Sequence, residues 1–226
     1  RSLSAPPSIP QAETGTGVIL SITPPSGEAL TYTQVYEKAA PSIAALTAYS
    51  AGMVSTGTGI VLTADGYIVT NAHIIAGAEQ VNVTLSDDSL WSAQLVGFEP
   101  LEDLAVLKID ASGLTPAQFG DDTLLRSGDP VSAIGNPMGY RSTITPGIVS
   151  ALDQPVSVEG TTMYLLQTSA AINYGSSGGA LLNDRGQVVG VTTIKIVADD
   201  GSAEGLGFAI PTTRVKQVVD RLIAGA

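Results

Sequence analysis

The chain has 226 residues, of which 44% are hydrophobic and 14% charged, and its formal net charge is -11. With 10 Lys and Arg against 21 Asp and Glu, it lacks the clustered cations that hold nucleic-acid phosphates, so we expect no nucleic-acid partner. It contains no Cys and one His, which excludes disulfides and thiolate metal sites, and we expect neither a metal nor a cofactor. No run of about 18 apolar residues predicts a membrane-spanning helix, and because the sequence starts at Arg1 rather than Met, we expect any signal or anchor upstream.

The first thirty residues are rich in Pro, Ser, Thr and Gly, a composition that buries little apolar surface. We therefore expect residues 1–14 to form a tether and residues 18–22 to form a short strand. Thr31 or Thr33 can cap a short helix, which Pro41 should stop.

From residue 42 onward the pattern changes to short β-branched runs separated by turn signals such as Asp65-Gly66, as in a barrel or sandwich. A polar stretch over residues 114–129 separates two such halves, each with six predicted strands. No sequence repeat relates the halves, so any similarity between them is architectural. The predicted strands are Ile43–Tyr49, Gly57–Thr63, Tyr67–Ala72, Val81–Leu85, Leu90–Phe98, Leu104–Ile109, Val131–Ile134, Thr143–Leu152, Thr162–Thr168, Gly179–Leu182, Gln187–Ile196 and Gly205–Ile210.

The chain ends in a predicted amphipathic helix that follows Pro211. Its apolar residues fall at positions i, i+3, i+4, i+7 and i+8, as on one face of a helix. Thr212 or Thr213 can cap its start, and Ala224-Gly225 should end it. We expect this helix to pack as a lid on the second set of strands.

A serine lies in the glycine-rich segment Gly175-Ser176-Ser177-Gly178-Gly179, and a serine is a weak nucleophile until a base removes its proton. His73 is the only imidazole, so it must be the base of any ordinary serine hydrolase built on this chain. The pattern Gly-x-Ser-x-Gly also occurs in α/β-hydrolases, but there the His follows the Ser. Because no His follows Ser177, the order His, acid, Ser favours the chymotrypsin architecture.

The predicted fold is therefore all-β, with two six-stranded antiparallel β-barrels of the chymotrypsin or trypsin type and short N-terminal and C-terminal helices. We expect residues 1–30 to form the tether and short strand, residues 31–115 the first barrel, and residues 116–226 the second barrel with the terminal helix.

The acid that orients the imidazole should lie between His73 and the serine. We predict Asp103, because it opens the apolar run 104–107 and should be held at the edge of a core. The other candidates before residue 115 lie at a polar hairpin tip or just after a strand: Asp87, Asp88 and Asp110.

Backbone N–H groups of the glycine-rich segment predict an oxyanion hole, because Gly permits the tight turn that aims them at one point. The predicted hole comprises Gly175, Ser176 and Ser177, with the N–H groups of Gly175 and Ser177 as its main donors. A Ser and Gly turn between strands is the alternative for this motif alone. The agreement of three separate segments, around His73, Asp103 and Ser177, disfavours that alternative.

Six ordered segments resemble the trypsin-like protease domain of the HtrA (Deg) family over roughly residues 31–224. The resemblance implies a serine endopeptidase of extracytoplasmic protein quality control that acts on unfolded or misfolded polypeptide, with His73, Asp103 and Ser177 as the triad. It also implies a homotrimer assembled through the N-terminal segment, and PDZ domains or a membrane anchor outside this sequence. The segments are TNAHIIAGAEQVNVTLSDDS, DLAVLKID, GDPVSAIGNPMG, TITPGIVSAL, QTSAAINYGSSGGALLNDRGQVVGVTTI and GLGFAIP.

The sequence departs from the family pattern at Ser169, Tyr174 and Ser176, where the family usually has Asp, Pro and Asn. Replacing Pro by Tyr174 loosens the peptide that builds the oxyanion hole. The alternative function is therefore a peptide-binding or chaperone module whose triad is held inactive.

Trypsin-like enzymes that cut after Lys or Arg carry an Asp six residues before the nucleophile, where this chain has Ala171. We expect a small apolar pocket and a broad preference for small aliphatic P1 residues, since shape discriminates by only about 1–3 kcal/mol per methylene. An edge strand at 205–210 should pair with the substrate backbone. The acidic residues Asp199, Asp200 and Glu204 predict a solvated turn rather than a cation site. The predicted pocket residues are Ile172, Asn173, Leu206, Gly207 and Phe208.

Overall fold

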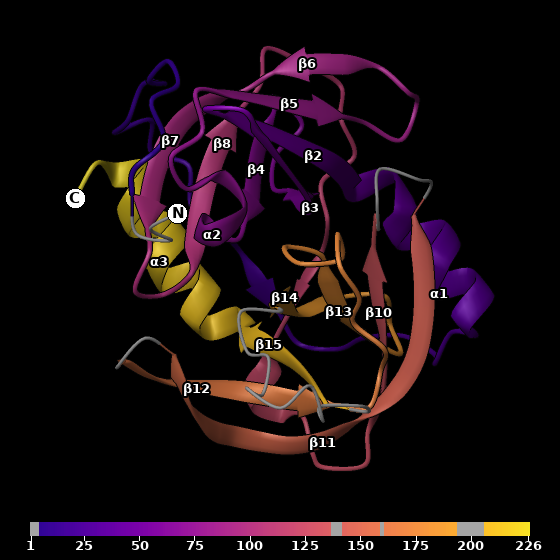
Figure 1. The fold of residues 1–226 in the computed structure, drawn as a ribbon. Helices are drawn as coiled ribbons and strands as arrows, with labels where there is room; N and C mark the ends of the chain where they lie inside the picture. The colour runs from indigo at the N-terminus through magenta and orange to yellow at the C-terminus, as the bar shows by residue number, and fades with distance from the viewer. Residues whose placement is uncertain (1–4, 137–141, 159–160, 194–205) are drawn as a thin grey trace.

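The computed structural model describes residues 5–136, 142–158, 161–193 and 206–226, and consists of two curled β-sheets stacked end to end with helix α3 (Thr212–Ala224) across them (Figure 1). The sheets are antiparallel apart from short parallel pairings of Phe119–Gly120 with Ile22–Thr23 and with Val188, and a single parallel bridge between Gln11 and Leu95. The predicted two-barrel, trypsin-like architecture is confirmed.

The first sheet has seven strands in the order β6-β5-β2-β3-β4-β8-β7. The predicted strand Leu90–Phe98 is two strands, because it is interrupted at buried Ala93, whose N–H donates to Val81 O. The part before Ala93 pairs with β5, and the part after it pairs with β8. The bounds are β2 (Ile43–Ser50), β3 (Met53–Val61), β4 (Tyr67–Thr70), β5 (Gln80–Thr84), β6 (Leu90–Ser92), β7 (Gln94–Glu99) and β8 (Leu104–Lys108).

The second sheet has the order β1-β9-β14-β13-β10-β11-β12-β15, and pairing of β14 with β15 closes six of these strands into a barrel. The predicted second set of six strands corresponds to these six, although its calls on residues 194–196 and on Gly205 lie outside the described residues. The bounds are β1 (Ile22–Thr23), β9 (Phe119–Gly120), β10 (Pro130–Gly135), β11 (Thr143–Val158), β12 (Thr161–Thr168), β13 (Ala180–Asn183), β14 (Val188–Thr193) and β15 (Gly207–Pro211).

The first helix, α1 (Tyr32–Ala39), begins where the capping residue predicts it. Thr31 accepts from Gln34 N–H, and the Gln34 side chain accepts from Thr31 N–H, which is a capping box. Pro41 does not end the helical turn at once: it lies in a 3₁₀ turn, η1 (Ala40–Ser42), in which the missing N–H of proline is tolerated near the start.

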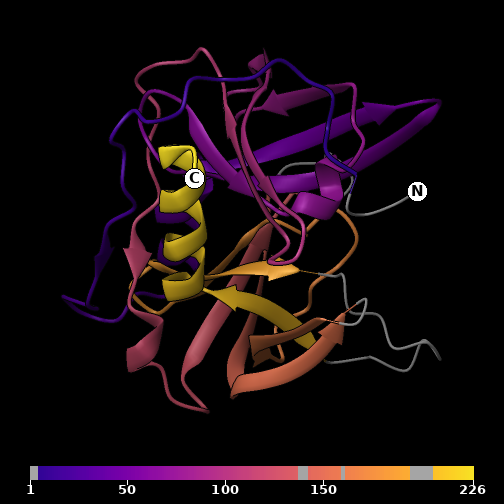
Figure 2. The ribbon, with the colours of Figure 1, turned by 90° about the vertical axis from the view of Figure 1, so that its left-hand side faces the viewer.

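Helix α3 packs across both sheets, against β7 and β8 of the first and β14 and β15 of the second, rather than as a lid on the second alone (Figure 2). The chain approaches closely at Gly97, where an added Cβ would lie 2.7 Å from Leu222 Cβ. The helix is not capped by Thr212 or Thr213: Pro211 is the N-cap residue, and Asp122 of the short 3₁₀ turn η2 (Asp122–Leu124) accepts from Thr213 N–H at 2.7 Å. Gly225 ends the helix in the left-handed conformation, as predicted.

The N-terminal segment is bound to both sheets, so a tether does not describe residues 5–14. Ala12 N–H donates to Leu95 O, and Leu95 N–H donates to Pro10 O. Further on, Gly15 N–H donates to Ile223 O, and β1 pairs in parallel with β9. Residues 5–23, which we call the strap, thus run along both sheets and past α3 (Figure 2). The predicted strand at 18–22 is therefore shorter and displaced to Ile22–Thr23.

One hydrophobic cluster spans the junction of the two sheets and includes residues of α1 and α3, while each sheet has a further cluster of its own. The junction is thus a packed core, and residues contributed by the two sheets are held in fixed relation there. In the part of the chain that the structure describes, no helix is long and apolar enough to cross a membrane.

Candidate active site

His73 and Asp103 meet at the end of the first sheet that faces the second. His73 lies in the single-turn helix α2 (Ala72–Ile75), which directly follows β4 and was not predicted, and Asp103 precedes β8, the neighbour of β4. His73 Nδ1 lies 2.9 Å from Asp103 Oδ2 and 3.0 Å from Oδ1, and His73 N–H also donates to Oδ1 at 3.0 Å. An ionised carboxylate only accepts hydrogen bonds, so this pairing places the proton on Nδ1 and leaves the lone pair on Nε2.

Asp103 has a left-handed backbone conformation, with φ of 52°, which non-glycine residues seldom adopt. The buried side chain of Asn71 donates from Nδ2 to Asp103 O at 3.0 Å and so holds this conformation. Asn71 is the N-cap residue of α2 by position but makes no side-chain capping bond; its Nδ2 is used on Asp103 O, and its buried Oδ1 has no hydrogen-bond partner among the described residues.

Thr193, at the end of β14, supplies a contact from the second barrel. Its Oγ1–H donates to Asp103 Oδ2 at 2.9 Å, and both residues are buried. Three donors, the backbone and ring N–H groups of His73 and this hydroxyl, thus compensate Asp103 for the water it lacks. The sequence interpretation missed Thr193. Its only local signal is that it ends an apolar run as the second residue of the pair Thr192-Thr193.

Ser177 lies in the turn between β12 and β13, in the same corner. Its carbonyl accepts from Thr58 N–H at 2.8 Å, and Gly178 N–H donates to Thr192 O at 2.9 Å, next to Thr193. Gly178 has φ of 85°, and an added Cβ would collide with Thr58 O and lie 2.5 Å from Thr70 Oγ1. Only glycine therefore allows the turn to approach the first sheet this closely. Ser177 is buried, with 3% of the residue exposed.

Residues 173–176 form a turn of defined type before the serine. Ser176 N–H donates to Asn173 O at 2.9 Å, and Gly175 has φ of 85°. These are the two marks of a type II turn, whose central peptide is reversed relative to a type I turn with the same hydrogen bond. The conformation of Gly175 thus fixes the direction of its N–H, whereas the N–H of Ser176 is already used within the turn.

Thr58, on β3, holds this turn from the other barrel. Its Oγ1–H donates to Gly175 O at 2.7 Å, while Oγ1 accepts from Asn136 N–H at 2.8 Å. Its carbonyl accepts from Thr70 Oγ1 at 2.7 Å, so every polar group of this fully buried residue is used. The sequence interpretation did not identify Thr58.

The predicted pocket residues are brought together in part. Half-buried Ile172 lies against Gly207, where an added Cβ would be 2.8 Å from Ile172 Cδ1, and Phe208 is buried beside them in β15. Asn173 is exposed, and so is Leu206 at 49%. The acidic residues Asp199, Asp200 and Glu204 lie outside the described residues, and no group of three metal-ligating side chains occurs in the described ranges.

A family model described as a trypsin-like peptidase domain matches residues 57–191, more than half of the chain. The solved structure of HtrA-type protease AlgW with tripeptide superposes with a TM-score of 0.81 at 40% identity, covering 86% of this chain and 64% of that one. The chain belongs to the HtrA-type trypsin-like peptidases. The resemblance drawn from the six sequence segments is confirmed.

Curated relatives in this HtrA-type family are longer than this chain. Serine protease PepD of Mycobacterium tuberculosis is 40% identical over 98% of this chain and 50% of its own length. A probable periplasmic serine endoprotease, DegP-like, from Chlamydia trachomatis is 45% identical over 74% of this chain and 34% of its own length. The chain thus spans between a third and a half of the length of these relatives.

Proposed function

We propose that this chain is a serine endopeptidase in which His73, Asp103 and Ser177 are the catalytic triad. The observation that carries the proposal is the pairing of buried Asp103 with His73 Nδ1 at 2.9 Å, in the corner that also holds the Ser177 turn. The relatives named serine endoprotease and serine protease support the same activity.

In the proposed mechanism, His73 Nε2 removes the proton from Ser177 Oγ as that oxygen attacks the carbonyl carbon of the scissile peptide. Asp103 stabilises the imidazolium that results, and His73 then gives the proton to the departing amine. Water, deprotonated by His73, hydrolyses the acyl-enzyme and releases Ser177.

The negative oxygen of the tetrahedral intermediate would be stabilised by the N–H groups of Gly175 and Ser177. The type II turn supports Gly175 as a donor, since it fixes the direction of that N–H. Ser176, which we predicted as a third member, donates its N–H to Asn173 O and so contributes by shaping the turn.

Small aliphatic P1 residues are the proposed specificity, because Ala171 provides no counter-charge for a basic side chain. Ile172, Gly207 and Phe208 would form the apolar wall, with Leu206 and Asn173 at its exposed edge. The proposed substrates are unfolded or misfolded polypeptides, which can present an extended segment to the site.

An extracytoplasmic location and a homotrimer are further parts of the proposal. The relatives called periplasmic support the location. Exposed Tyr32 and the apolar hollow beside it, which includes Leu30 and Val35, offer a surface for self-association. Tyr36 donates to Ser142 O and is partly used within the chain. Sedimentation that gives a monomer mass would remove the trimer.

A fluorophosphonate probe tests the activity, because it reacts only with an activated serine. We expect it to label Ser177, and both labelling and hydrolysis of an unfolded protein should vanish in Ser177→Ala and in His73→Ala. Retained hydrolysis in His73→Ala would overturn the proposal, since the chain has no second imidazole. Tight binding of unfolded protein without turnover would instead favour the inactive peptide-binding alternative.

A further inference from the structure

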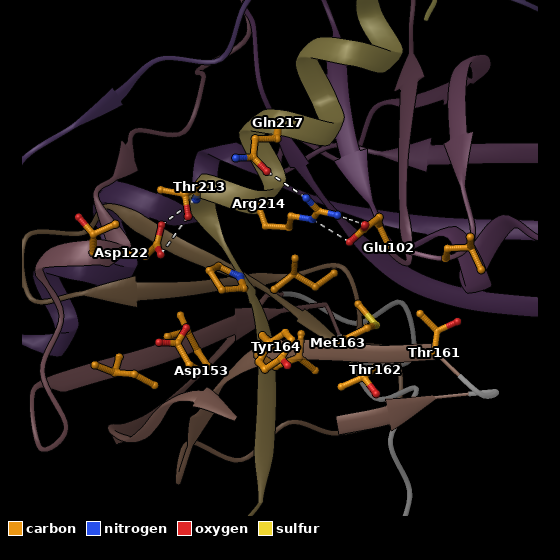
Figure 3. Close-up of a pocket in the computed structure, with 17 residues that line it drawn as sticks. Glu102, Asp122, Asp153, Thr161, Thr162, Met163, Tyr164, Thr213, Arg214 and Gln217 are labelled. Carbon is orange, nitrogen blue, oxygen red and sulfur yellow. Dashed lines mark hydrogen bonds and ion pairs between the residues drawn. The ribbon is translucent and has the colours of Figure 1, made fainter. Parts of the chain in front are cut away.

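A groove of about 660 Å³ lies beside the residues that lead into Asp103 (Figure 3). One wall is β12, and the opposite wall is formed by Leu101, Glu102 and the start of α3. The catalytic proposal uses none of these lining residues.

The groove exposes the free edge of β12. Residues 161–165 pair with β11 on one side, but β15 pairs only with Leu166, Gln167 and Thr168 on the other. Among the described residues, no strand continues the pairing, because β15 ends at Pro211, which has no N–H to donate. An unpaired strand edge presents the N–H and C=O groups that an extended polypeptide can satisfy.

Apolar side chains stand at both walls of the groove. Tyr164 projects from β12 and is 64% exposed, and Leu101 on the opposite wall is also 64% exposed. A strand added at the β12 edge would cover both, so apolar burial would add to the backbone pairing.

The groove carries an excess of negative charge. Its single Arg, Arg214, is bound by both carboxylate oxygens of Glu102 and by Gln217, as the dashed lines in Figure 3 mark. Asp122 accepts from Thr213, and exposed Asp153 makes no ion pair with any described residue. Burial raises the pKa of Asp122, and an approaching cation would oppose this effect. A ligand side chain that is cationic fits this balance better than a neutral or acidic one.

Asp153 has φ of 47° and lies where the β11–β12 register shifts between Ala151 and Gln154. A bulge of this kind redirects a side chain that regular pairing would place elsewhere. Here it brings a carboxylate to the groove beside the β12 edge.

We propose that this groove binds an extended segment of the polypeptide substrate that carries Lys or Arg, at a distance from the scissile bond. The inference rests on the proposed endopeptidase function for the identity of its ligand. Two links connect the lining of the groove with the proposed site: Glu102 precedes Asp103, and β12 pairs with Phe208 and Gly207 of the proposed pocket. An unfolded chain bound at both places would gain affinity, because the second contact would be an intramolecular event.

Binding to the Ser177→Ala variant tests the groove without depending on hydrolysis. Three fluorescent peptides share one short aliphatic central sequence. The first is this central sequence alone, the second adds a tail that contains Val and Lys, and the third has the same tail with Glu in place of each Lys. The tail is placed before the centre in one set and after it in another. We expect the Lys-tailed peptide to bind about 2- to 5-fold more tightly per exposed charge pair than the Glu-tailed one, with a difference that shrinks in high salt.

Two substitutions, each in the Ser177→Ala background, assign this effect to the groove. Asp153→Asn removes the charge but retains a residue that tolerates the left-handed backbone, and Tyr164→Ala removes the exposed ring. The matched controls are Asp88→Asn, at another exposed Asp with positive φ, and Tyr49→Ala, at a tyrosine that is 40% exposed, both on the first sheet or its turns.

Loss of the Lys preference in Asp153→Asn and weaker binding of tailed peptides in Tyr164→Ala, with no change in the controls or with the short peptide, would support the proposal. Equal binding of Lys- and Glu-tailed peptides in both sets would overturn it, and so would an equal loss in the controls. A failure of the endopeptidase function is distinguishable, because it would appear as absent fluorophosphonate labelling of the unsubstituted protein whatever the peptides do.

Discussion

The hydroxyl of Thr193 donates a hydrogen bond to Asp103 Oδ2 across the junction of the two barrels, at 2.9 Å. This bond links the residue we propose as the catalytic acid to the barrel that carries the proposed nucleophile. The relative position of Ser177 and His73 is thus coupled to the packing between barrels.

Thr193→Val removes this donor and keeps the side-chain shape. A hydrogen bond to a buried charged group contributes about 1.5–3 kcal/mol, so we expect kcat/KM for a short peptide to fall by about tenfold or more. Thr193→Ser should recover most of the activity. Thr212→Val is a matched control, since it removes another buried hydroxyl, which donates to Val188 O, and should lower stability without this loss of activity.

Thr58→Val should impair the oxyanion turn while leaving all three proposed triad residues in place. Without the bond to Gly175 O, the Gly175 N–H is less well fixed, and loss of one oxyanion donor costs about 10²–10³ in kcat in related chemistry, so we expect a smaller fall of about 10- to 100-fold. The change should appear in kcat and in the fluorophosphonate labelling rate, with KM little altered. Rescue by Thr58→Ser is expected, and a KM-only effect would contradict the assigned role.

Gly178→Ala should abolish activity and lower stability together. The added Cβ would collide with Thr58 O, and φ of 85° is unfavourable for alanine. Gly113→Ala provides the control, because Gly113 also has positive φ but has open space where the Cβ would lie. Urea denaturation and peptide hydrolysis should both separate the two variants, and equal effects would show that backbone strain alone is responsible.

Asp122 should make stability depend on pH in a direction unusual for a carboxylate. Burial raises its pKa above 3.8, an effect that the bonds from Thr213 only partly offset. Between 3.8 and the raised value, the folded state binds more protons than the unfolded state, so the free energy of unfolding falls as pH rises through this window. Asp122→Asn keeps an acceptor for Thr213 N–H but does not titrate, so it should gain stability relative to the unsubstituted protein across the window.

Urea denaturation at several pH values from below 3.8 to neutrality measures this difference. Asp122→Ala should be less stable than Asp122→Asn by about 1 kcal/mol at every pH, because neither variant titrates at this position and Ala leaves Thr213 N–H at the start of α3 without its acceptor. A relative stability of Asp122→Asn that stays constant or decreases as pH rises would contradict the expected sign.

The sequence predicted the strands well because short β-branched runs between turn signals reflect local alternation and burial. The strand prediction failed at Leu90–Phe98, where the apolar run continues although the strand breaks. The break is seen only in the pairing, because β6 pairs with β5 and β7 pairs with β8. The sequence interpretation also selected Asp103 over Asp87, Asp88 and Asp110, and the structure brings Asp103 to His73. An acid that directly precedes a buried apolar run is held next to the core, because the following residues fix the position of its backbone.

Thr58 and Thr193 could not be predicted in the same way. The bond from Thr58 to Gly175 joins residues 117 positions apart, and that from Thr193 to Asp103 joins residues 90 apart. Neither threonine stands out locally, since Thr is common in strands and a hydroxyl carries no periodicity. Their roles depend on how the two barrels pack against each other, and the sequence pattern within one barrel does not predict that packing.

The strap formed by the N-terminal segment was misjudged for a related reason: its composition predicts little apolar burial, whereas backbone hydrogen bonds and a few buried side chains, such as Ile9 and Leu20, attach it to the sheets. That attachment has a consequence if the chain cleaves unfolded polypeptides, as we propose. A Pro-, Ser- and Thr-rich segment left free would be an accessible target for neighbouring copies. Because its backbone is bound to β7, β9 and α3, the segment would have to detach before it could enter another molecule's site as an extended strand, and this would protect the proposed endopeptidase from digesting itself there.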